Sequence, residues 1–228
     1  MNNRLKALLA TVALALAAAC AAPQQQSTVN TATSNTANGN AAAQATPQMS
    51  GADHGNMNHG AMDHANMRSS PNSASQPYDL QFLDTMIAHH QGAVDMARPA
   101  ETKAQHAELK EMARNIIRDQ EREIAQMKQW REQWYAGKPA SVNMEMPGMM
   151  DSMRGMDMNR MNAASGNEFD LMFLDMMTPH HQGAVVMARE ALTKAEHPEI
   201  KRLAQQIIDA QEREIAQMKG WKQAWGAK

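Results

Sequence analysis

The sequence predicts an all-α protein whose ordered part is a four-helix bundle made from two copies of one helical hairpin. The first observation is an internal repeat, because 36 of 56 residues are identical when residues 79–134 are aligned with residues 170–225. The copies lie 91 residues apart without a gap. The second observation is that apolar residues within each copy recur at the spacing of amphipathic helices. Similarity at a constant offset indicates a duplicated supersecondary unit.

Each copy is expected to contain two helices. In the first copy they cover about residues 79–103 and 107–135, and the second copy repeats both. A two-helix hairpin cannot bury its own apolar stripe, so the two copies are expected to pack together as a bundle. One difference is Pro179, which stands where the first copy has Ala88. Because proline removes a helical hydrogen bond, we expect the second copy to be kinked or restarted just before His180.

The chain divides into segments of different composition. We expect a signal peptide over residues 1–19 and a disordered tether, with a His/Met-rich segment, over residues 20–76. The duplicated bundle covers residues 77–228. It consists of repeats at about residues 77–135 and 168–226, joined by a Met-rich connector at residues 136–167.

The N-terminus has the pattern of an export signal. Arg4 and Lys6 precede an apolar run that is too short to span a bilayer. Small residues then precede Cys20, as in a bacterial lipoprotein cleavage site, although Ala17 replaces the usual leucine. One prediction is therefore lipidation of Cys20, which would be the protein's only attachment to a membrane. The alternative is ordinary cleavage near Ala19, which releases an unanchored exported protein.

Composition and motifs exclude several classes of function. The formal net charge is −2 and no Lys/Arg tract is present, so nucleic acid is not an expected partner. The single cysteine excludes an intramolecular disulfide. Glu-x-x-His, His-Glu-x-x-His and Gly-x-Ser-x-Gly are all missing, so no catalytic residues are assigned and the protein is not expected to be an enzyme.

The connector carries the strongest functional signal. It holds eight methionines within 18 residues, interrupted by glycine, proline and charged residues. They are Met144, Met146, Met149, Met150, Met153, Met156, Met158 and Met161. This pattern does not fit a regular buried helix, and we expect exposed thioethers, which favour Cu(I) and by the same reasoning Ag(I). The alternatives are an apolar loop that binds a partner and a methionine sink for oxidants.

The tail before the bundle carries a second signal, in which histidine and methionine alternate. The candidate ligands are His54, Met57, His59, Met62 and His64. Imidazole suits Cu(II) and thioether suits Cu(I), so this segment is expected to hold either copper state. The alternative is a polar low-complexity linker.

Adjacent histidines occur at the same place in each copy, with methionines at helical spacing. The candidate ligands are Met86, His89, His90 and Met96 in the first copy and Met177, His180, His181 and Met187 in the second. Metal binding and a structural hydrogen-bond network remain equal alternatives. The network would join these histidines to glutamates, and Glu123 with Gln120, or Glu214 with Gln211, on the facing helices would complete a polar cluster. For His106 and His197, a role at the start of the second helix is favoured over metal binding.

The combined motif resembles the family called domain of unknown function 305. The resemblance is carried by the following residues: Phe173-Leu174-Asp175-Met176-Met177, Pro179, His180-His181-Gln182-Gly183-Ala184-Val185, Met187-Ala188, and later Gln211, Glu214-Ile215, Met218 and Trp221. It implies a ferritin-like four-helix bundle that is commonly exported. A cyanobacterial periplasmic relative is implicated in copper binding and resistance, which implies a similar role here. The first copy departs from the pattern at Ala88.

These observations together predict an exported protein that binds copper, and possible silver binding follows from the same ligands. Its expected place is the periplasm or cell envelope, anchored through Cys20, and its expected role is metal sequestration, resistance or delivery. Expected partners are metal ions and a copper exporter or another periplasmic copper protein. Two alternatives remain, a metal-dependent oxidase of Cu(I) and a helical module that binds a partner without metal.

Overall fold

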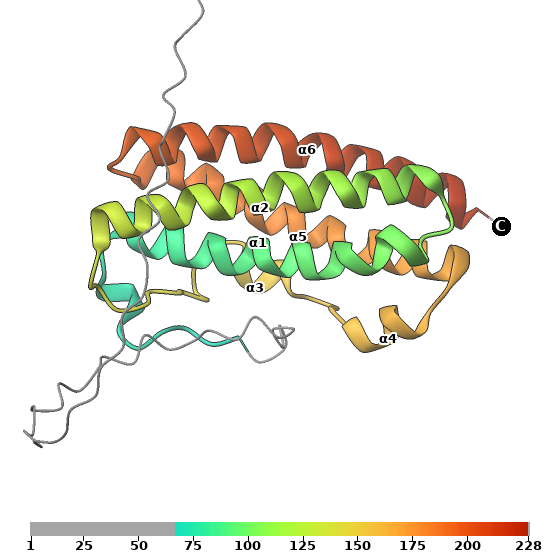
Figure 1. Cartoon of the computed structure of the whole chain (residues 1–228), viewed down its shortest axis with the longest axis horizontal. Helices are drawn as coiled ribbons and strands as arrows, with labels where there is room; N and C mark the ends of the chain where they lie inside the picture. Colours follow the sequence, from blue (N-terminus) through green and yellow to red (C-terminus); the bar gives the residue numbers. More distant parts are fainter. Residues whose placement is uncertain (1–66, 228) are drawn as a thin grey trace, which may run out of the picture. The chain divides into compact units, whose positions relative to one another are not determined.

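The computed structural model describes residues 67–227, and its regular secondary structure is helical (Figure 1). The four long helices are α1 (Tyr78–Lys103), α2 (Ala107–Tyr135), α5 (Gly166–Lys194) and α6 (Pro198–Gly226). Two short helices, α3 (Met149–Ser152) and α4 (Met158–Ala163), lie in the connector, and a 3-10 turn, η2 (Ser73–Ser75), precedes α1. No strand occurs in residues 67–227, so the predicted all-α class is confirmed for them.

Several predictions concern residues 1–66 and lie outside the described residues. They are the signal peptide, lipidation of Cys20, the tether up to residue 66, and the tail ligands from His54 to His64. The last part of the predicted tether, residues 67–76, is described and contacts the connector, since the Ser70 N–H group donates a hydrogen bond to the Val142 carbonyl at 2.8 Å. Within the described part, no helix combines the length and the apolar character needed to cross a bilayer.

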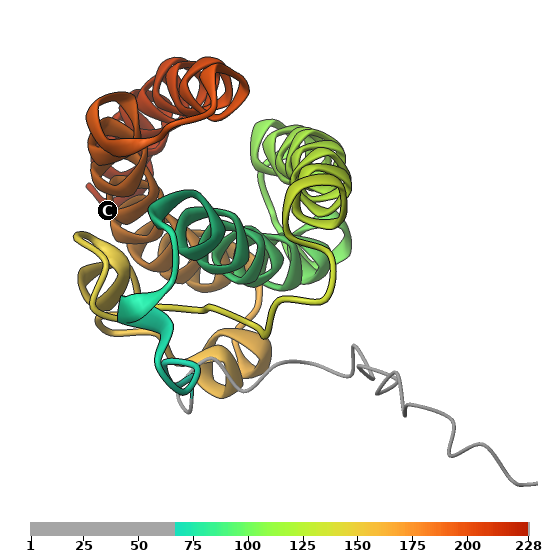
Figure 2. The ribbon, with the colours of Figure 1, turned by 90° about the vertical axis from the view of Figure 1, so that its left-hand side faces the viewer.

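The two repeats form two hairpins that meet along their first helices. α1 packs on α2, α5 packs on α6, and the hairpins join through α1 and α5. Figure 2 shows α2 and α6 standing apart on one side of the α1–α5 pair, while the connector with α3 and α4 lies on the other side. The arrangement is therefore a bundle that is open between α2 and α6.

The residues between α2 and α6 explain why this side stays open. The inner faces of α1 and α5 are apolar or histidine-bearing, and they are buried along most of their length. α2 and α6 instead face each other near their centres with carboxylate, amide and guanidinium groups, among them Glu123 and Glu214. Closing the gap would remove these charged groups from water, which is unfavourable unless each finds a partner.

The two repeats are held together by reciprocal caps at their helix turns. Asp170 of α5 accepts hydrogen bonds from the backbone N–H groups of Gln105 and His106 in the α1–α2 turn, at 2.9 Å each, and contacts the His106 ring at 2.6 Å. Asp79 of α1 makes the equivalent contacts with the α5–α6 turn and His197. His106 and His197 are the N-cap residues of α2 and α6, which confirms their predicted helix-entry role.

The connector packs against α5, and the expectation that its methionines are exposed was wrong. Met144, Met146, Met149 and Met161 are buried, and only Met150 is highly exposed, at 65%. The glycines explain part of this result, since α3 approaches α5 where Gly148 meets Gly183. A Cβ atom on either residue would overlap the backbone of the other, so the close contact requires glycine at both positions.

Pro179 does not divide the second repeat's first helix. α5 runs from Gly166 to Lys194 with Pro179 inside it, so of the two predicted outcomes, a kink or a restart before His180, the restart was wrong. α1 likewise continues through Pro99. Packing of α5 on α1, α3 and α6 stabilises the helix on both sides of the proline, which itself removes only one helical hydrogen bond.

Candidate metal centre

The paired histidines lie in the centre of the molecule, where α1 packs on α5. His89, His90, His180 and His181 are all buried. The rings of His89 and His180 meet across the helix interface with their centroids 3.8 Å apart. The duplication therefore brings the two histidine pairs to one place, although they are 91 residues apart in sequence.

The second histidine of each pair contacts a carboxylate on the neighbouring helix. His90 Nε2 lies 2.7 Å from Glu123 Oε2, and His181 Nε2 lies 2.7 Å from Glu214 Oε2. A carboxylate accepts a hydrogen bond, so the proton of a neutral ring stays on Nε2 and the lone pair is left on Nδ1. Both Nδ1 atoms are buried and have no hydrogen-bond partner among the described residues.

This pairing is typical of metal-binding histidines. A carboxylate that receives the N–H group on one side of the ring fixes the ring's tautomer and raises the basicity of the other nitrogen. The predicted His–Glu network is therefore present, and it leaves one imidazole nitrogen in each repeat available as a ligand. The network and metal binding are compatible rather than exclusive.

The first histidine of each pair borders a small cavity beneath the connector. The cavity has a volume of about 10 Å³. Its lining consists of Met67, Ala88, His89, Gly92, Met149, Ser152, Met153, Met156 and His180. Four thioethers and two imidazoles thus surround a space of roughly the size that holds one water molecule or one ion. Carboxylates are not part of this lining.

The chemistry of these groups favours a soft monovalent ion. Thioether sulfur selects Cu(I), and imidazole also binds copper. Among the residues that the structure describes, no three His, Cys, Asp or Glu side chains gather in a way that would hold a metal ion. The soft-ligand candidates of this part of the chain are therefore the two imidazoles together with the thioethers that line the cavity.

The structure divides the predicted ligands into groups. His89, His180, Met149, Met153 and Met156 line the cavity. Several others lie in the hydrophobic cores instead, namely Met86, Met96, Met144, Met146, Met161, Met177 and Met187. Met158 is partly buried against the second core, and Met150 points to the surface.

Met67 is a lining residue that sequence reasoning did not assign. It stands just before the predicted linker, at the end of the His/Met-rich tail segment, and the helical spacing of the bundle gives no reason to place it near His89. Its position next to the tail ligands was the one available signal.

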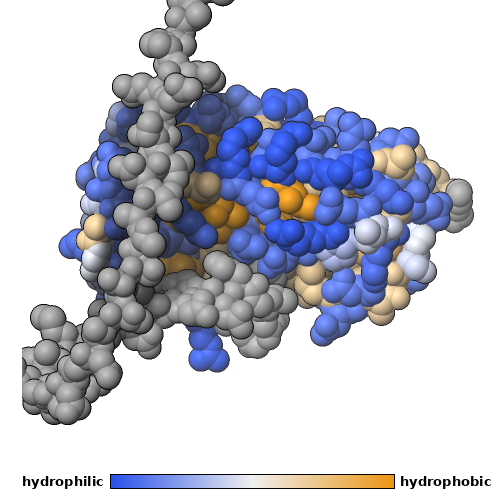
Figure 3. Space-filling model, viewed as in Figure 1, coloured by the Kyte–Doolittle hydropathy of each residue, from blue (hydrophilic) through white to orange (hydrophobic). Residues whose placement is uncertain are grey.

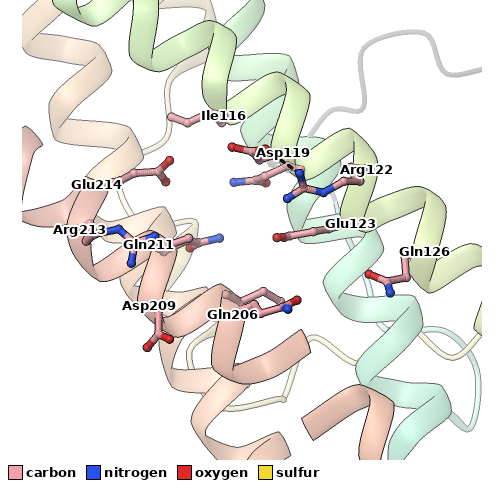
Figure 4. Close-up of a pocket in the computed structure, with 13 residues that line it drawn as sticks. Ile116, Asp119, Arg122, Glu123, Gln126, Gln206, Asp209, Gln211, Arg213 and Glu214 are labelled. Atoms are coloured by element: carbon pink, nitrogen blue, oxygen red, sulfur yellow. Dashed lines mark ion pairs between the residues drawn. The ribbon is translucent and has the colours of Figure 1, made fainter. Parts of the chain in front are cut away.

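A groove opens on the opposite side of the α1–α5 pair, between α2 and α6. Its volume is about 550 Å³. Figure 4 shows Glu123 on α2 and Glu214 on α6 reaching into the space between these helices. Each carboxylate therefore joins a buried histidine to this groove. The histidine pairs lie between a sulfur-rich cavity on one side and an oxygen-rich groove on the other.

The surface is otherwise polar. Met150 and Val186 are the exposed large hydrophobic residues of the described part. Figure 3 shows hydrophilic residues over most of one face, with a few hydrophobic residues between them. Large hydrophobic side chains that are highly exposed are therefore few among the described residues.

Solved structures resemble this chain closely, whereas no curated protein sequence matches it. CopM in its Cu(I)-bound form is 45% identical, with a TM-score of 0.56, and the match covers 66% of this chain and 99% of CopM. CopM has also been solved with Cu(II), at 46% identity, a TM-score of 0.57 and coverage of 66% and 99%. A DUF305 protein of Streptomyces coelicolor that is thought to be secreted is 27% identical, with a TM-score of 0.58 and coverage of 69% and 96%.

The fold and the site define a class of helical proteins in which two related hairpins bring paired histidines together. The family described as domain of unknown function (DUF305) matches the chain twice, over residues 10–131 and 79–222. The chain belongs to the DUF305 family. The double match agrees with the internal duplication, and the resemblance noted in the sequence is confirmed.

Proposed function

We propose that this chain is an exported protein that binds Cu(I) and Ag(I) and sequesters them, confers resistance or delivers them to a partner. The observation that carries the proposal is the cavity where Met149, Met153 and Met156 of the connector meet His89 and His180. The ferritin-like bundle supplies the histidines, and the connector supplies most of the thioethers.

Burial supports a monovalent ion in preference to a divalent one. The cavity lining contains no carboxylate that would offset a second positive charge, and a larger charge is more costly to move into such surroundings. Thioethers do not ionise, so the methionines hold an ion without adding charge of their own. The buried Nδ1 atoms of His90 and His181 are further ligands that we assign to this centre.

The relatives support the choice of metal. CopM has been solved with Cu(I), with Cu(II) and with silver bound. Cu(II) is the less favoured form for the cavity, and the imidazoles of the tail, His54, His59 and His64, are its proposed ligands. Met57 and Met62 of the tail would hold Cu(I).

Export rests on the N-terminal sequence together with a relative that is thought to be secreted. We place the protein in the periplasm or cell envelope, attached through a lipid on Cys20. A copper exporter or another periplasmic copper protein is the proposed partner for metal transfer.

We assign no enzymatic activity. No structural observation favours the alternative of a Cu(I) oxidase. The alternative of a helical module that binds a partner without metal requires the connector methionines to be exposed. Most of those methionines are buried or partly buried, and three of them face the histidines.

The test is anaerobic Cu(I) titration of the full chain against a chromogenic chelator. In the variant Met149→Leu/Met153→Leu/Met156→Leu, the apolar volume is nearly kept while three thioethers are removed. We expect the tightest Cu(I) site to weaken at least about tenfold, the lower end of the loss seen when a metal site loses a supporting group. X-ray absorption at one equivalent should show sulfur and nitrogen ligands together.

The matched control is Met144→Leu/Met146→Leu/Met161→Leu, which changes three buried connector methionines outside the cavity. It should bind Cu(I) like the original chain. Equal losses of Cu(I) affinity in both variants would mean that the connector methionines affect binding only through the stability of the fold. Unchanged affinity in the first variant would place the site elsewhere.

A further inference from the structure

The segment that precedes α1 is a strap that lies along the connector. We use the name strap for residues 67–76 (Figure 2). The Ser70 N–H group donates a hydrogen bond to the Val142 carbonyl at 2.8 Å, and the Val142 N–H group donates to Ser70 Oγ at 3.1 Å. The Met144 N–H group donates to Ser69 Oγ at 2.9 Å. Two serine side chains of the strap therefore accept hydrogen bonds from the backbone of the connector.

The two ends of the strap are held differently. Near α1, Ser73 is buried, and the Gln81 side chain donates a hydrogen bond to the Gln76 carbonyl at 2.6 Å. Toward Met67, the two serine contacts described above hold the chain on the connector. The entropy lost when a few backbone residues become ordered is comparable with what a few hydrogen bonds return. The first residues of the strap can therefore detach while the end near α1 stays fixed.

Met67 stands at this more weakly held end and reaches the cavity. It is partly buried against the first hydrophobic core, and it lines the cavity together with His89 and His180. The other three lining methionines belong to the connector, which approaches α5 closely where Gly148 meets Gly183. Met67 is therefore the lining thioether that the strap carries, and its position depends on the strap.

Apolar filling is the other role that a methionine can have at this place. Filling explains Met144 and Met146, which are buried in the first core and do not line the cavity. Met67 differs from them, because two imidazoles share its cavity and the space has about the size of one ion. A soft ion binds thioether sulfur and imidazole nitrogen together, so a ligand role explains this combination better than filling does.

We propose that Met67 is a ligand of the ion in the cavity and that the strap controls how fast this ion leaves. The inference rests on the proposed copper function and adds a route of release. When the strap is attached, the Met67 thioether and the connector thioethers hold the ion together. Detachment breaks the contacts of Ser69 and Ser70 and removes one thioether, while the helices stay in place. Since the ion binds the attached form better, ion binding stabilises the attached strap.

The first test measures the release of Cu(I) from the full chain. The protein is loaded with one equivalent and mixed with excess chromogenic chelator without oxygen. Met67→Leu nearly keeps the apolar volume and removes the thioether. We expect release at least about tenfold faster, the lower end of the effect of losing a supporting group at a metal site. Ser69→Ala/Ser70→Ala keeps Met67 and removes both hydroxyl acceptors, so release should be faster by a smaller factor.

Both variants have matched controls. Met172→Leu changes a partly buried methionine of α5 that lies outside the cavity. Ser75→Ala changes a serine whose hydroxyl donates a hydrogen bond within the strap, to the Asn72 carbonyl at 2.8 Å. Both controls should release Cu(I) at the rate of the original chain.

Trypsin gives a second measurement, which reports the position of the strap. Arg68 is exposed, but cleavage after it requires the neighbouring serines to leave the connector. One equivalent of Ag(I) should slow this cleavage at least about tenfold in the original chain, because cleavage follows the population of the detached strap. In Met67→Leu, Ag(I) should have little effect on the cleavage rate. A chromogenic peptide substrate in the same samples checks that trypsin itself stays active.

The outcomes separate this inference from the proposed function. If the original chain binds Cu(I) and Met67→Leu releases it at the same rate, the strap proposal is overturned and the copper proposal stands. Cleavage after Arg68 that does not respond to Ag(I) has the same meaning. Equal acceleration in Met172→Leu would assign the effect to general packing and would also overturn the strap proposal. Absence of Cu(I) binding by the original chain would overturn both proposals.

Discussion

The two histidines of each pair are adjacent in sequence but have different surroundings. Consecutive residues on a helix point about 100° apart. His89 and His180 therefore meet each other beside the cavity, whereas His90 and His181 turn to Glu123 and Glu214. One histidine faces sulfur and its neighbour is held by a carboxylate. Each pair therefore contacts the cavity through its first histidine and the neighbouring glutamate through its second.

The carboxylate behind His90 provides a test at the scale of one residue. Glu123→Gln keeps a hydrogen-bond acceptor for the Nε2–H group and removes the negative charge. Cu(I) affinity should fall by roughly tenfold or more, because the carboxylate increases the basicity of the ligand nitrogen. Competition with a chelator measures the change. Glu121→Gln, on the exposed side of α2, is the control and should leave affinity unaltered. Unchanged affinity in Glu123→Gln would remove His90 from the metal centre.

At the scale of elements, the connector behaves as part of the core and also as part of the site. α3 lies against α5, and Ser152 of α3 donates a hydrogen bond from Oγ to the Met149 carbonyl at 2.6 Å. This places the methionines of α3 and the following turn over His180 and His89. The position of the thioethers therefore depends on how closely α3 approaches α5.

Gly183→Ala tests that dependence. The added Cβ would overlap the Gly148 carbonyl and Ser152, neither of which is the end of a flexible side chain. α3 must then move away, and we expect a loss of about 1–3 kcal/mol in unfolding free energy, the usual range for overpacking. Cu(I) affinity should fall with it. Chemical denaturation and metal titration measure the two effects.

Gly220→Ala on α6 is the matched control for this substitution. Nothing lies within 4 Å of a Cβ atom at Gly220, so the change should stabilise the helix by about 0.5–1 kcal/mol. Opposite signs at the two glycines would support close packing of α3. A neutral or stabilising Gly183→Ala would show that α3 is not held tightly on α5.

At the scale of the whole molecule, the two repeats depend on each other. Asp79 of the first repeat caps the turn of the second, and Asp170 of the second caps the turn of the first. The two N-cap histidines also stack on tryptophans near the helix ends of the other hairpin, with ring centroids 3.8 Å apart for His106 and Trp225 and for His197 and Trp134. The repeats should consequently unfold together.

Asp170→Asn tests this cooperativity. The buried carboxylate accepts several hydrogen bonds, and an amide cannot replace all of them, so we expect a loss of about 2–3 kcal/mol. Thermal unfolding of the metal-free protein should show one transition at a lower temperature. Asp175→Asn, at an exposed position of the same helix, is the control and should have little effect. Two separate transitions in Asp170→Asn would mean that the repeats are stable independently.

Much of this protein could be predicted from local patterns in the sequence. The duplication, the helical class, the approximate limits of the long helices and the four histidines all follow from repetition and periodicity. The helix-entry role of His106 and His197 followed from their place between two periodic segments. These features depend on residues close together in sequence, where spacing alone determines which side chains share a face.

The site itself was decided by packing between distant segments. Periodicity could not show that His89 meets His180, that α3 lies over both, or that Met67 reaches the same cavity. Nor could it separate the three cavity methionines from those that fill the cores, because a thioether serves as ligand and as apolar filling alike. Local spacing is enough to define the helices and to show that soft ligands are abundant. Which of these ligands converge depends on how α1, α5 and the connector approach one another in space, and no local pattern encodes that approach.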